Sequence, residues 1–259
     1  WSSRSSAAPG ASAPSTQGWV LADAFDRAAP TYDAMVALSP GYHDQLLGAA
    51  GALLDRLPAP DGSALKVLDL GCGSGASTQA LLEQWRTRGG AADLLSVTGV
   101  DMSEGMVAQA RAKSWATGVD LVVSDAVTYL EALPDDSVDG ILACYLLRNV
   151  PDRERLVREM ARVLRPGGGV VIHDYSVQGS TRAKAIWATI CHGVIIPLAV
   201  IKRSDVPLHR YLYTSVRDFD SVARICERLL GAGMVDVRHR TYPGWQRDVI
   251  HTVGGSAPS

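Results

Sequence analysis

One strand-like run of the chain leads directly into a glycine-rich turn. The run 66–70 is followed by Gly71, Gly73 and Gly75, and a helix-compatible stretch then continues to Trp85. Because glycine lacks a Cβ atom, the backbone there can turn sharply and approach a ligand closely. In an open α/β sheet, ligands bind at such turns, at the carboxyl ends of parallel strands. The feature therefore predicts an α/β fold with a binding site at this edge of the sheet.

The rest of the chain alternates strands with helices, which predicts a mostly parallel sheet covered by helices on both faces. The other expected strands are 95–100, 121–123, 138–144, 170–174, 234–240 and 247–253. Further helices are expected over 43–57, 105–115, 152–164 and 220–230. Because no helix separates the last two strands, we predict a Rossmann-like seven-stranded sheet, mostly parallel, with one antiparallel edge strand.

The composition fits a single domain. The chain has 259 residues, 47% of them hydrophobic, enough for one sizeable core. Residues 1–18 are rich in Ser, Ala and Pro, so we expect a disordered tail there. We expect one domain over 19–254 and a short tail over 255–259. Within the domain, 176–215 interrupts the alternation. Its apolar run 185–201 is shorter than the roughly 20 residues of a helix that spans a membrane. We therefore expect a helical lid insertion over the acceptor side, or else a buried element packed on the helices of the sheet.

Charge and cysteine content argue against several classes of protein. The formal net charge is -2 without a basic cluster, so no nucleic-acid partner is expected. The cysteines are widely spaced and form no Cys-x-x-Cys pair, so neither a metal site nor a disulfide framework is expected. Reduced cysteines, and a start that lacks the apolar core of a secretion signal, fit a cytoplasmic protein.

Two aspartates follow later strands at the same predicted edge of the sheet. Asp101 is placed to accept hydrogen bonds from ribose hydroxyls, and Asp125 from an adenine amino group. The glycines alone also fit a dinucleotide pattern ending at Ala76, or a tight turn without a ligand. However, Asp69 directly before the glycines and the segment 164–169 (LRPGGG) resemble class I methyltransferases.

Four further segments carry a more specific pattern. They are 25–33 (FDRAAPTYD), 38–43 (LSPGYH), 146–153 (LLRNVPDR) and 211–219 (YLYTSVRDF). Together they resemble the ubiquinone/menaquinone biosynthesis C-methyltransferase family, over about residues 25 to 237 and only loosely across 176–208. The segment 146–153 is the most specific of them, whereas many methyltransferases share the glycine motifs.

This resemblance implies an S-adenosylmethionine-dependent methyltransferase of small-molecule biosynthesis, which releases S-adenosylhomocysteine. The residues that it implies for cofactor binding are Tyr32, Asp69, Gly71, Cys72, Gly73, Gly75, Asp101, Met102, Ser124, Asp125, Ala126 and Cys144. The candidate catalytic residues are Arg148, Tyr32, His43 and His209.

Each catalytic candidate has a structural alternative. Arg148 would stabilise a phenolate or orient a water molecule, or it would only cap a helix or pair with a carboxylate. Tyr32 would close over the cofactor, or it would be a packed aromatic residue. His43 matches a histidine of the family but also fits a structural role, and His209 is a pocket candidate beside Arg210.

Two segments depart from the family. The sequence His-Asp-Tyr-Ser at 173–176 stands where the family usually has Leu-Glu-Phe-Ser, and 242–248 replaces a glycine-rich strand. The acceptor is therefore expected to be an aromatic or quinol-like molecule or a specialised metabolite. The expected reaction is methylation of one of its carbon atoms. The alternatives are O- or N-methylation, and cofactor-assisted cyclisation or binding only. If the acceptor is lipophilic or aromatic, the protein could contact a membrane peripherally. A homodimer is a separate alternative for its assembly.

Overall fold

The computed structural model describes residues 23–27, 29, 41–58, 62–115, 118–197 and 206–259. At its centre lies a seven-stranded sheet in the order β3-β2-β1-β4-β5-β7-β6. The strands are β1 (Leu65–Leu70), β2 (Leu95–Asp101), β3 (Val119–Val123), β4 (Val138–Cys144), β5 (Leu164–Tyr175), β6 (Val235–Thr241) and β7 (Ile250–Ser256). β1 to β5 are parallel, and β7 runs antiparallel between β5 and β6. The predicted Rossmann-like, mostly parallel sheet is confirmed.

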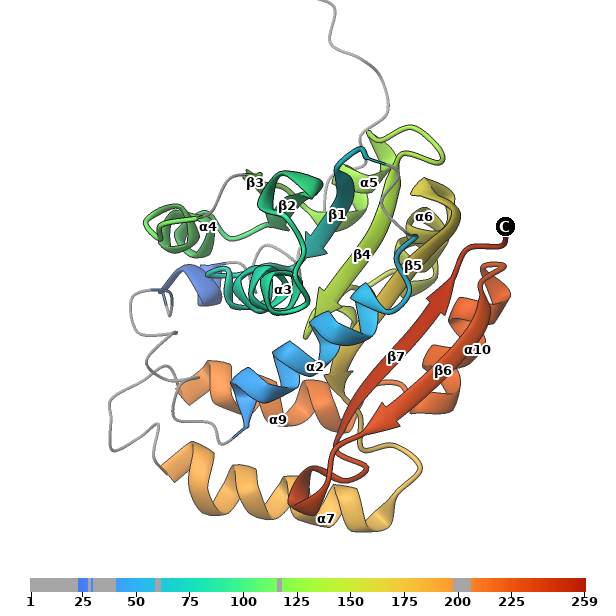
Figure 1. Ribbon diagram of the computed structural model, residues 1–259. Coiled ribbons are helices and arrows are strands. Elements are labelled where there is room, and N and C mark those ends of the chain that lie inside the picture. Colours follow the sequence, from blue (N-terminus) through green and yellow to red (C-terminus); the bar gives the residue numbers. More distant parts are fainter. Residues whose placement is uncertain (1–22, 28, 30–40, 59–61, 116–117, 198–205) are drawn as a thin grey trace, which may run out of the picture.

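Helices cover both faces of this sheet (Figure 1). They are α2 (Tyr42–Leu54), α3 (Ala76–Thr87), α4 (Glu104–Arg111), α5 (Ala126–Glu131), α6 (Arg153–Val163), α7 (Thr181–Ile190), α9 (Val206–Arg217) and α10 (Val222–Gly231). Short turns lie at η1 (Ala92–Leu94), η2 (Leu147–Asn149), η3 (Cys191–Ile195, a π-helix) and η4 (Gly244–Gln246). Buried apolar side chains of α2 and α3 pack on one face, and those of α5, α6 and α10 pack on the other.

The central strands are apolar because helices cover both of their faces. Every residue of β4 is buried, and it pairs in parallel with β1 and β5. Parallel pairing aligns the carboxyl ends of the strands at one edge of the sheet. The loops after β1, β2, β3 and β4 therefore meet there, which is where the sequence predicts a site.

The described part of the insertion 176–215 forms α7, η3 and α9, which lie beyond the carboxyl ends of β4 and β5 (Figure 1). Part of its apolar surface is core, because Ala183, Trp187 and Cys191 pack in one buried cluster with Val249 and Ile250 of the β7 end. Residues 198–205 lie outside the described residues.

Several predicted boundaries change. β5 begins at Leu164, before the Pro-Gly-Gly sequence that appeared to separate helix from strand. β7 continues to Ser256, and Ala257 N donates to Gly168 O at 2.8 Å, so the predicted tail 255–259 is wrong. The short helix α5 was not predicted, and the predicted tail 1–18 lies outside the described residues. No helix in the described part of the chain is long and apolar enough to cross a membrane.

Candidate active site

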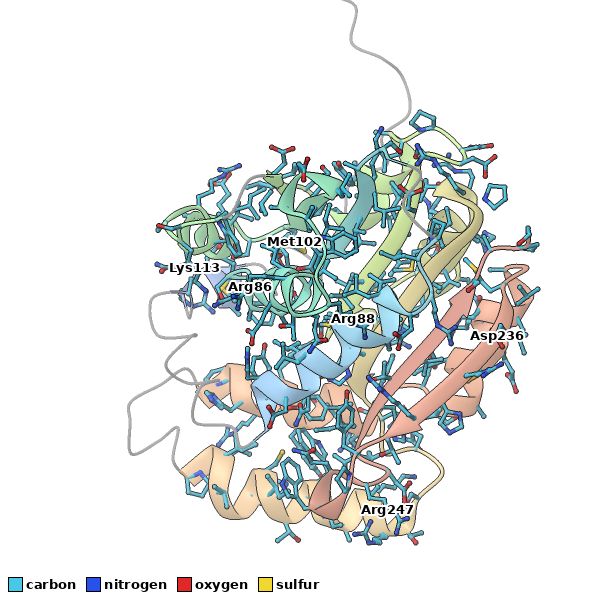
Figure 2. All side chains as sticks on the ribbon, viewed as in Figure 1. Arg86, Arg88, Met102, Lys113, Asp236 and Arg247 are labelled. Atoms are coloured by element: carbon cyan, nitrogen blue, oxygen red, sulfur yellow. The ribbon has the colours of Figure 1, made fainter. Side chains whose placement is uncertain are left out.

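A cavity of about 360 Å³ lies at the carboxyl ends of the central strands. It is lined by the glycine turn after β1, the loop after β2, the start of α5 and the segment after β4. Ten of the predicted site residues line it together: Gly71, Cys72, Gly73, Asp101, Met102, Ser124, Asp125, Ala126, Cys144 and Arg148. Figure 2 labels Met102, which directly follows β2 and lines the cavity.

The glycine turn is held against β2 by its own backbone. Gly71 N and Cys72 N both donate to Val100 O, at 2.7 and 3.1 Å. Gly71 and Gly73 have φ values of +70° and +54°, in the left-handed region that favours glycine. A Cβ atom on Gly71 would lie 3.0 Å from the side chain of Leu146. The turn thus needs glycine both for its conformation and for its close packing.

Asp101 joins the glycine turn to the loop after β2. Its Oδ2 accepts from Gly73 N and its Oδ1 from Ser103 N, both at 2.9 Å. Burial raises the pKa of Asp101, and these backbone donors oppose that shift. Each carboxylate oxygen retains a second lone pair, so Asp101 can also accept from a ligand in the cavity.

Asp69 and Gly75, predicted to bind the cofactor, do not line the cavity. Asp69 is completely buried, and its Oδ2 accepts from the hydroxyls of Ser77 at 2.7 Å and Thr78 at 2.6 Å. Burial raises the pKa of Asp69 to about 6. Gly75 has a φ of +89°, and a Cβ atom there would lie 2.6 Å from Trp115. Both residues shape the turn without lining the cavity, and their predicted role in cofactor binding stays a prediction.

Arg148 brings a cationic side chain to the cavity wall. Its Nη1 donates to Asp174 Oδ1 at 2.5 Å and to Tyr145 O at 3.0 Å. The guanidinium carbon lies 5.7 Å from the centre of the Tyr145 ring and 5.8 Å from that of Tyr175. Arg148 therefore occupies its predicted place beside the cavity and also forms the carboxylate pair that was its alternative role.

A buried hydrogen-bond network holds the hydroxyl of Tyr145 in place. Its hydroxyl donates to Gln45 Oε1 at 2.7 Å and lies 3.1 Å from Nε2 of His173. The other ring nitrogen of His173 lies 2.9 Å from Thr252 Oγ1. Tyr145 also stacks on Tyr42, which lines the cavity from α2. The network fixes the orientation of a ring that faces the cavity.

Two further catalytic candidates, His43 and His209, are described and do not line the cavity. His43 points outward from α2 with its side chain 57% exposed, and its Nε2 lies 3.4 Å from Glu83. Its predicted catalytic role is therefore not supported. His209 is buried on α9 but does not line the cavity. Tyr32 lies outside the described residues.

Sequence reasoning missed residues that come from distant segments. Asp26 holds the N-terminal segment on α4, because its Oδ1 accepts from Gly105 N at 2.9 Å and from the Ser103 hydroxyl. The neighbouring Phe25 lines the cavity. Both belong to the segment 25–33 that carries the family resemblance, so a signal was present although their contacts were not predictable.

The residues of this site fit S-adenosylmethionine. Gly71 and Gly73 have positive φ values, which favour glycine. Because glycine has no side chain, the backbone of this turn can approach a ligand closely. Asp101 and Asp125 follow successive strands and both line the cavity, in the order expected for ribose and adenine. Cys144 ends β4 and Arg148 follows in η2, and both line the same cavity.

Comparison with known proteins gives the same assignment. The ubiquinone/menaquinone biosynthesis C-methyltransferase UbiE of Geobacter sulfurreducens is 31% identical over 68% of this chain and 66% of its own length. The demethylmenaquinone methyltransferase of Mycolicibacterium paratuberculosis is 31% identical over 71% of this chain and 73% of its own. A crystal structure of the 4+2 cyclase SpnF has a TM-score of 0.64 at 18% identity, covers 95% of this chain and 97% of its own, and thus shares the fold.

The family model for the ubiE/COQ5 methyltransferase family matches residues 15–251. The match spans the glycine turn, the cavity and both departures from the family pattern. The protein is an S-adenosylmethionine-dependent methyltransferase, and the chain belongs to the ubiE/COQ5 methyltransferase family.

Proposed function

We propose that this enzyme transfers a methyl group to a ring carbon of a hydroxyl-bearing aromatic or quinol-like small molecule. The single observation that carries the proposal is the place of Arg148, which lines the same cavity as the glycine turn and Asp101. The rings of Tyr42 and Tyr145 line the cavity beside it and suit a flat acceptor. The C-methylation named for the Geobacter relative supports the carbon atom as the site of transfer.

S-adenosylmethionine supplies an electrophilic methyl group when bound. The acceptor carbon becomes a good nucleophile as its neighbouring hydroxyl loses a proton and negative charge develops on that oxygen. The Arg148 guanidinium would stabilise that charge, because a cation held in place beside a developing charge needs no reorganisation during the reaction. Tyr145, held by Gln45 and His173, would keep the acceptor ring in register with the methyl group.

The reaction can be tested directly with the full chain. It would be incubated anaerobically with S-adenosylmethionine and a 2-prenyl-1,4-naphthohydroquinone, and the products analysed by mass spectrometry and NMR. A methyl group on a ring carbon supports the proposal. A methyl group on oxygen would favour O-methylation. If an amine acceptor tested in the same assay gains an N-methyl group, N-methylation would be favoured. A product without an added methyl group would favour cyclisation or binding only.

The role of Arg148 gives a second test. Arg148→Ala should lower kcat by at least about 100-fold, the loss typical of one preorganised charge donor. The affinity for S-adenosylmethionine should change far less, because Asp101 and the glycine turn remain. Stopped assays and calorimetry separate the two quantities. Equal losses in both, or an unchanged kcat, would contradict the assignment.

We also propose that α7 and α9 form the acceptor-side wall, as the predicted lid. Support comes from the Tyr211 hydroxyl on α9, which donates to Asn149 Oδ1 at 3.1 Å, beside Arg148. Hydrogen exchange of α7 and α9 should slow when naphthohydroquinone is added with S-adenosylhomocysteine. If α7 and α9 exchange as slowly as β4 in the free protein, and the ligands do not change their exchange, these helices belong to the core and do not form a lid.

The proposed setting is the cytoplasm, with peripheral membrane contact by α7 and η3 and a homodimer as further proposals. Val194 in η3 is 57% exposed, which supports contact with an apolar surface. Flotation with lipid vesicles and analytical ultracentrifugation test the two associations separately.

A further inference from the structure

The cationic side chains that line the described cavity are Arg148 and Arg155, and each is paired with a carboxylate. Arg155, at the α5 side, donates from Nε to Glu131 Oε1 at 2.6 Å. Arg148, at the acceptor side, donates from Nη1 to Asp174 Oδ1 at 2.5 Å. Within the described residues, the cavity wall thus offers an acceptor no cation that lacks an anionic partner.

The Arg148–Asp174 pair is deeply buried and fixed in place. The two side chains are only 8% and 1% exposed. Asp174 is the penultimate residue of β5, and its Oδ1 also accepts from Tyr175 N at 2.9 Å. Its Oδ2 accepts from the backbone N of Arg148 at 3.3 Å. The carboxylate therefore holds both the guanidinium and the backbone of η2.

A carboxylate in this position changes which acceptors the arginine can attract. Charges interact strongly away from water, so an acceptor that brings its own carboxylate would be repelled by Asp174 almost as much as Arg148 attracts it. An uncharged hydroxyl avoids that repulsion on binding. Its oxygen would contact the guanidinium directly and lie farther from Asp174, so Arg148 would still stabilise the charge that develops there during methyl transfer. Discrimination by such a repulsive group is a common route to specificity.

We propose that Asp174 is a specificity-determining residue, which positions Arg148, neutralises it and restricts the acceptor to molecules without a negative charge at that point. This inference rests on the proposed function for the place of the acceptor beside Arg148. Beyond the proposed function, it specifies that the acceptor carries no negative charge near Arg148 and identifies Asp174 as the residue that selects for this property.

The test compares two probes that differ only by a carboxylate, 2-naphthol and 3-hydroxy-2-naphthoate. Both are fluorescent, and each is titrated into the full chain saturated with S-adenosylhomocysteine. Wild type should bind 2-naphthol more tightly. Asp174→Asn keeps the shape but removes the charge, so affinity for 3-hydroxy-2-naphthoate should rise about tenfold or more, the low end of coupling between close charges. Affinity for 2-naphthol should change by less than about threefold.

Matched variants separate charge selection from folding. Asp139→Asn removes a similarly buried aspartate whose Oδ1 accepts from Arg165 Nη1 at 2.8 Å outside the cavity, so it should leave both affinities unchanged. Asp174→Glu keeps the charge and should keep the wild-type preference. The double variant Arg148→Gln with Asp174→Asn should lose the gain in carboxylate affinity. If Asp174→Asn does not fold, Arg148→Gln should weaken carboxylate binding selectively, because Asp174 then acts alone.

Several results would overturn the inference. They are an unchanged carboxylate affinity in Asp174→Asn or in Arg148→Gln, a gain that persists in the double variant, and a wild type that prefers the carboxylate probe. The proposed reaction fails separately. A chain with the expected charge selection that adds no methyl group to carbon would refute the reaction and leave the role of Asp174 standing.

Discussion

Replacing His173 with leucine should make the stability of the enzyme less sensitive to acid. His173 is completely buried on β5, with ring nitrogens 2.9 Å from Thr252 Oγ1 and 3.1 Å from the Tyr145 hydroxyl. Burial lowers its pKa from 6.5 to about 3, and the nearby Arg240 and His251 contribute to the shift. The folded protein therefore keeps this ring neutral at pH values where the unfolded chain protonates it.

The sign and size of the effect follow from this difference. The pKa of His173 is lower in the folded state, so its contribution to stability is fully present above about pH 6.5 and is lost as pH falls toward 3. The loss is about 1.4 kcal/mol per pH unit inside that window. Between pH 7.5 and pH 5.0, His173 alone should thus remove about 2 kcal/mol from the free energy of unfolding.

Denaturant unfolding at pH 7.5 and pH 5.0 measures this loss in wild type, His173→Leu and Thr252→Val. His173→Leu should cost about 1–3 kcal/mol at pH 7.5, because Tyr145 and Thr252 lose a partner. From pH 7.5 to 5.0 it should then lose about 2 kcal/mol less stability than wild type. Thr252→Val removes a hydrogen bond but keeps the ring, so its pH dependence should follow wild type.

Asp69 acts in the opposite direction, since its raised pKa of about 6 makes the folded state bind a proton before the unfolded chain does. Its contribution increases stability as pH falls from about 6 toward 3.8. That term is common to all three proteins and cancels in the comparison. Identical pH dependence in wild type and His173→Leu would refute the reasoning.

Further substitutions test ligand binding by Asp101 and the conformation of the glycine turn. Asp101→Ala should weaken S-adenosylhomocysteine binding by about 1–3 kcal/mol, because the glycine turn loses its link to Asp101 and the ribose loses an acceptor; calorimetry with unchanged affinity would count against this. Gly75→Ala should lower the free energy of unfolding by about 1–3 kcal/mol, because φ is +89° and the new Cβ would lie 2.6 Å from Trp115. Gly231→Ala, where no atom lies within 4 Å of the new Cβ, should be close to neutral in the same denaturant assay.

The strands were predictable wherever apolar runs ended at clear turn residues, and less so where glycine lies inside a strand. The Gly-rich start of β5 pairs with β4 through a register shift between Val138 and Gly140. The end of β7 contains Gly254, where a Cβ atom would lie 2.5 Å from Arg56 Nε. Small residues there make room for a side chain from a distant segment, which no local pattern reveals.

Residues of the site were predictable where a strand end places them, and not where a helix does. Asp101 is the last residue of β2 and lines the cavity as expected. On α2, Tyr42 lines the cavity while the adjacent His43 is exposed, because neighbouring residues on a helix point in directions about 100° apart. A family motif that spans both residues does not say which of them faces the ligand.

Three aspartates lie near the carboxyl edge of the sheet, Asp69 and Asp174 buried and Asp101 half-buried, and sequence reasoning assigned Asp69 and Asp101 to the ligand. Burial raises the pKa of Asp69, Asp101 and Asp174 alike, so each carboxylate is held in its charged form only by the donors around it. Those donors are the start of α3, the glycine turn and Arg148, respectively. Each acid therefore fixes a part of the cavity wall, and of the three only Asp101 also lines the cavity. An acidic residue at a strand end is thus evidence of a preorganised edge first, and its contact with the ligand has to be established from its position.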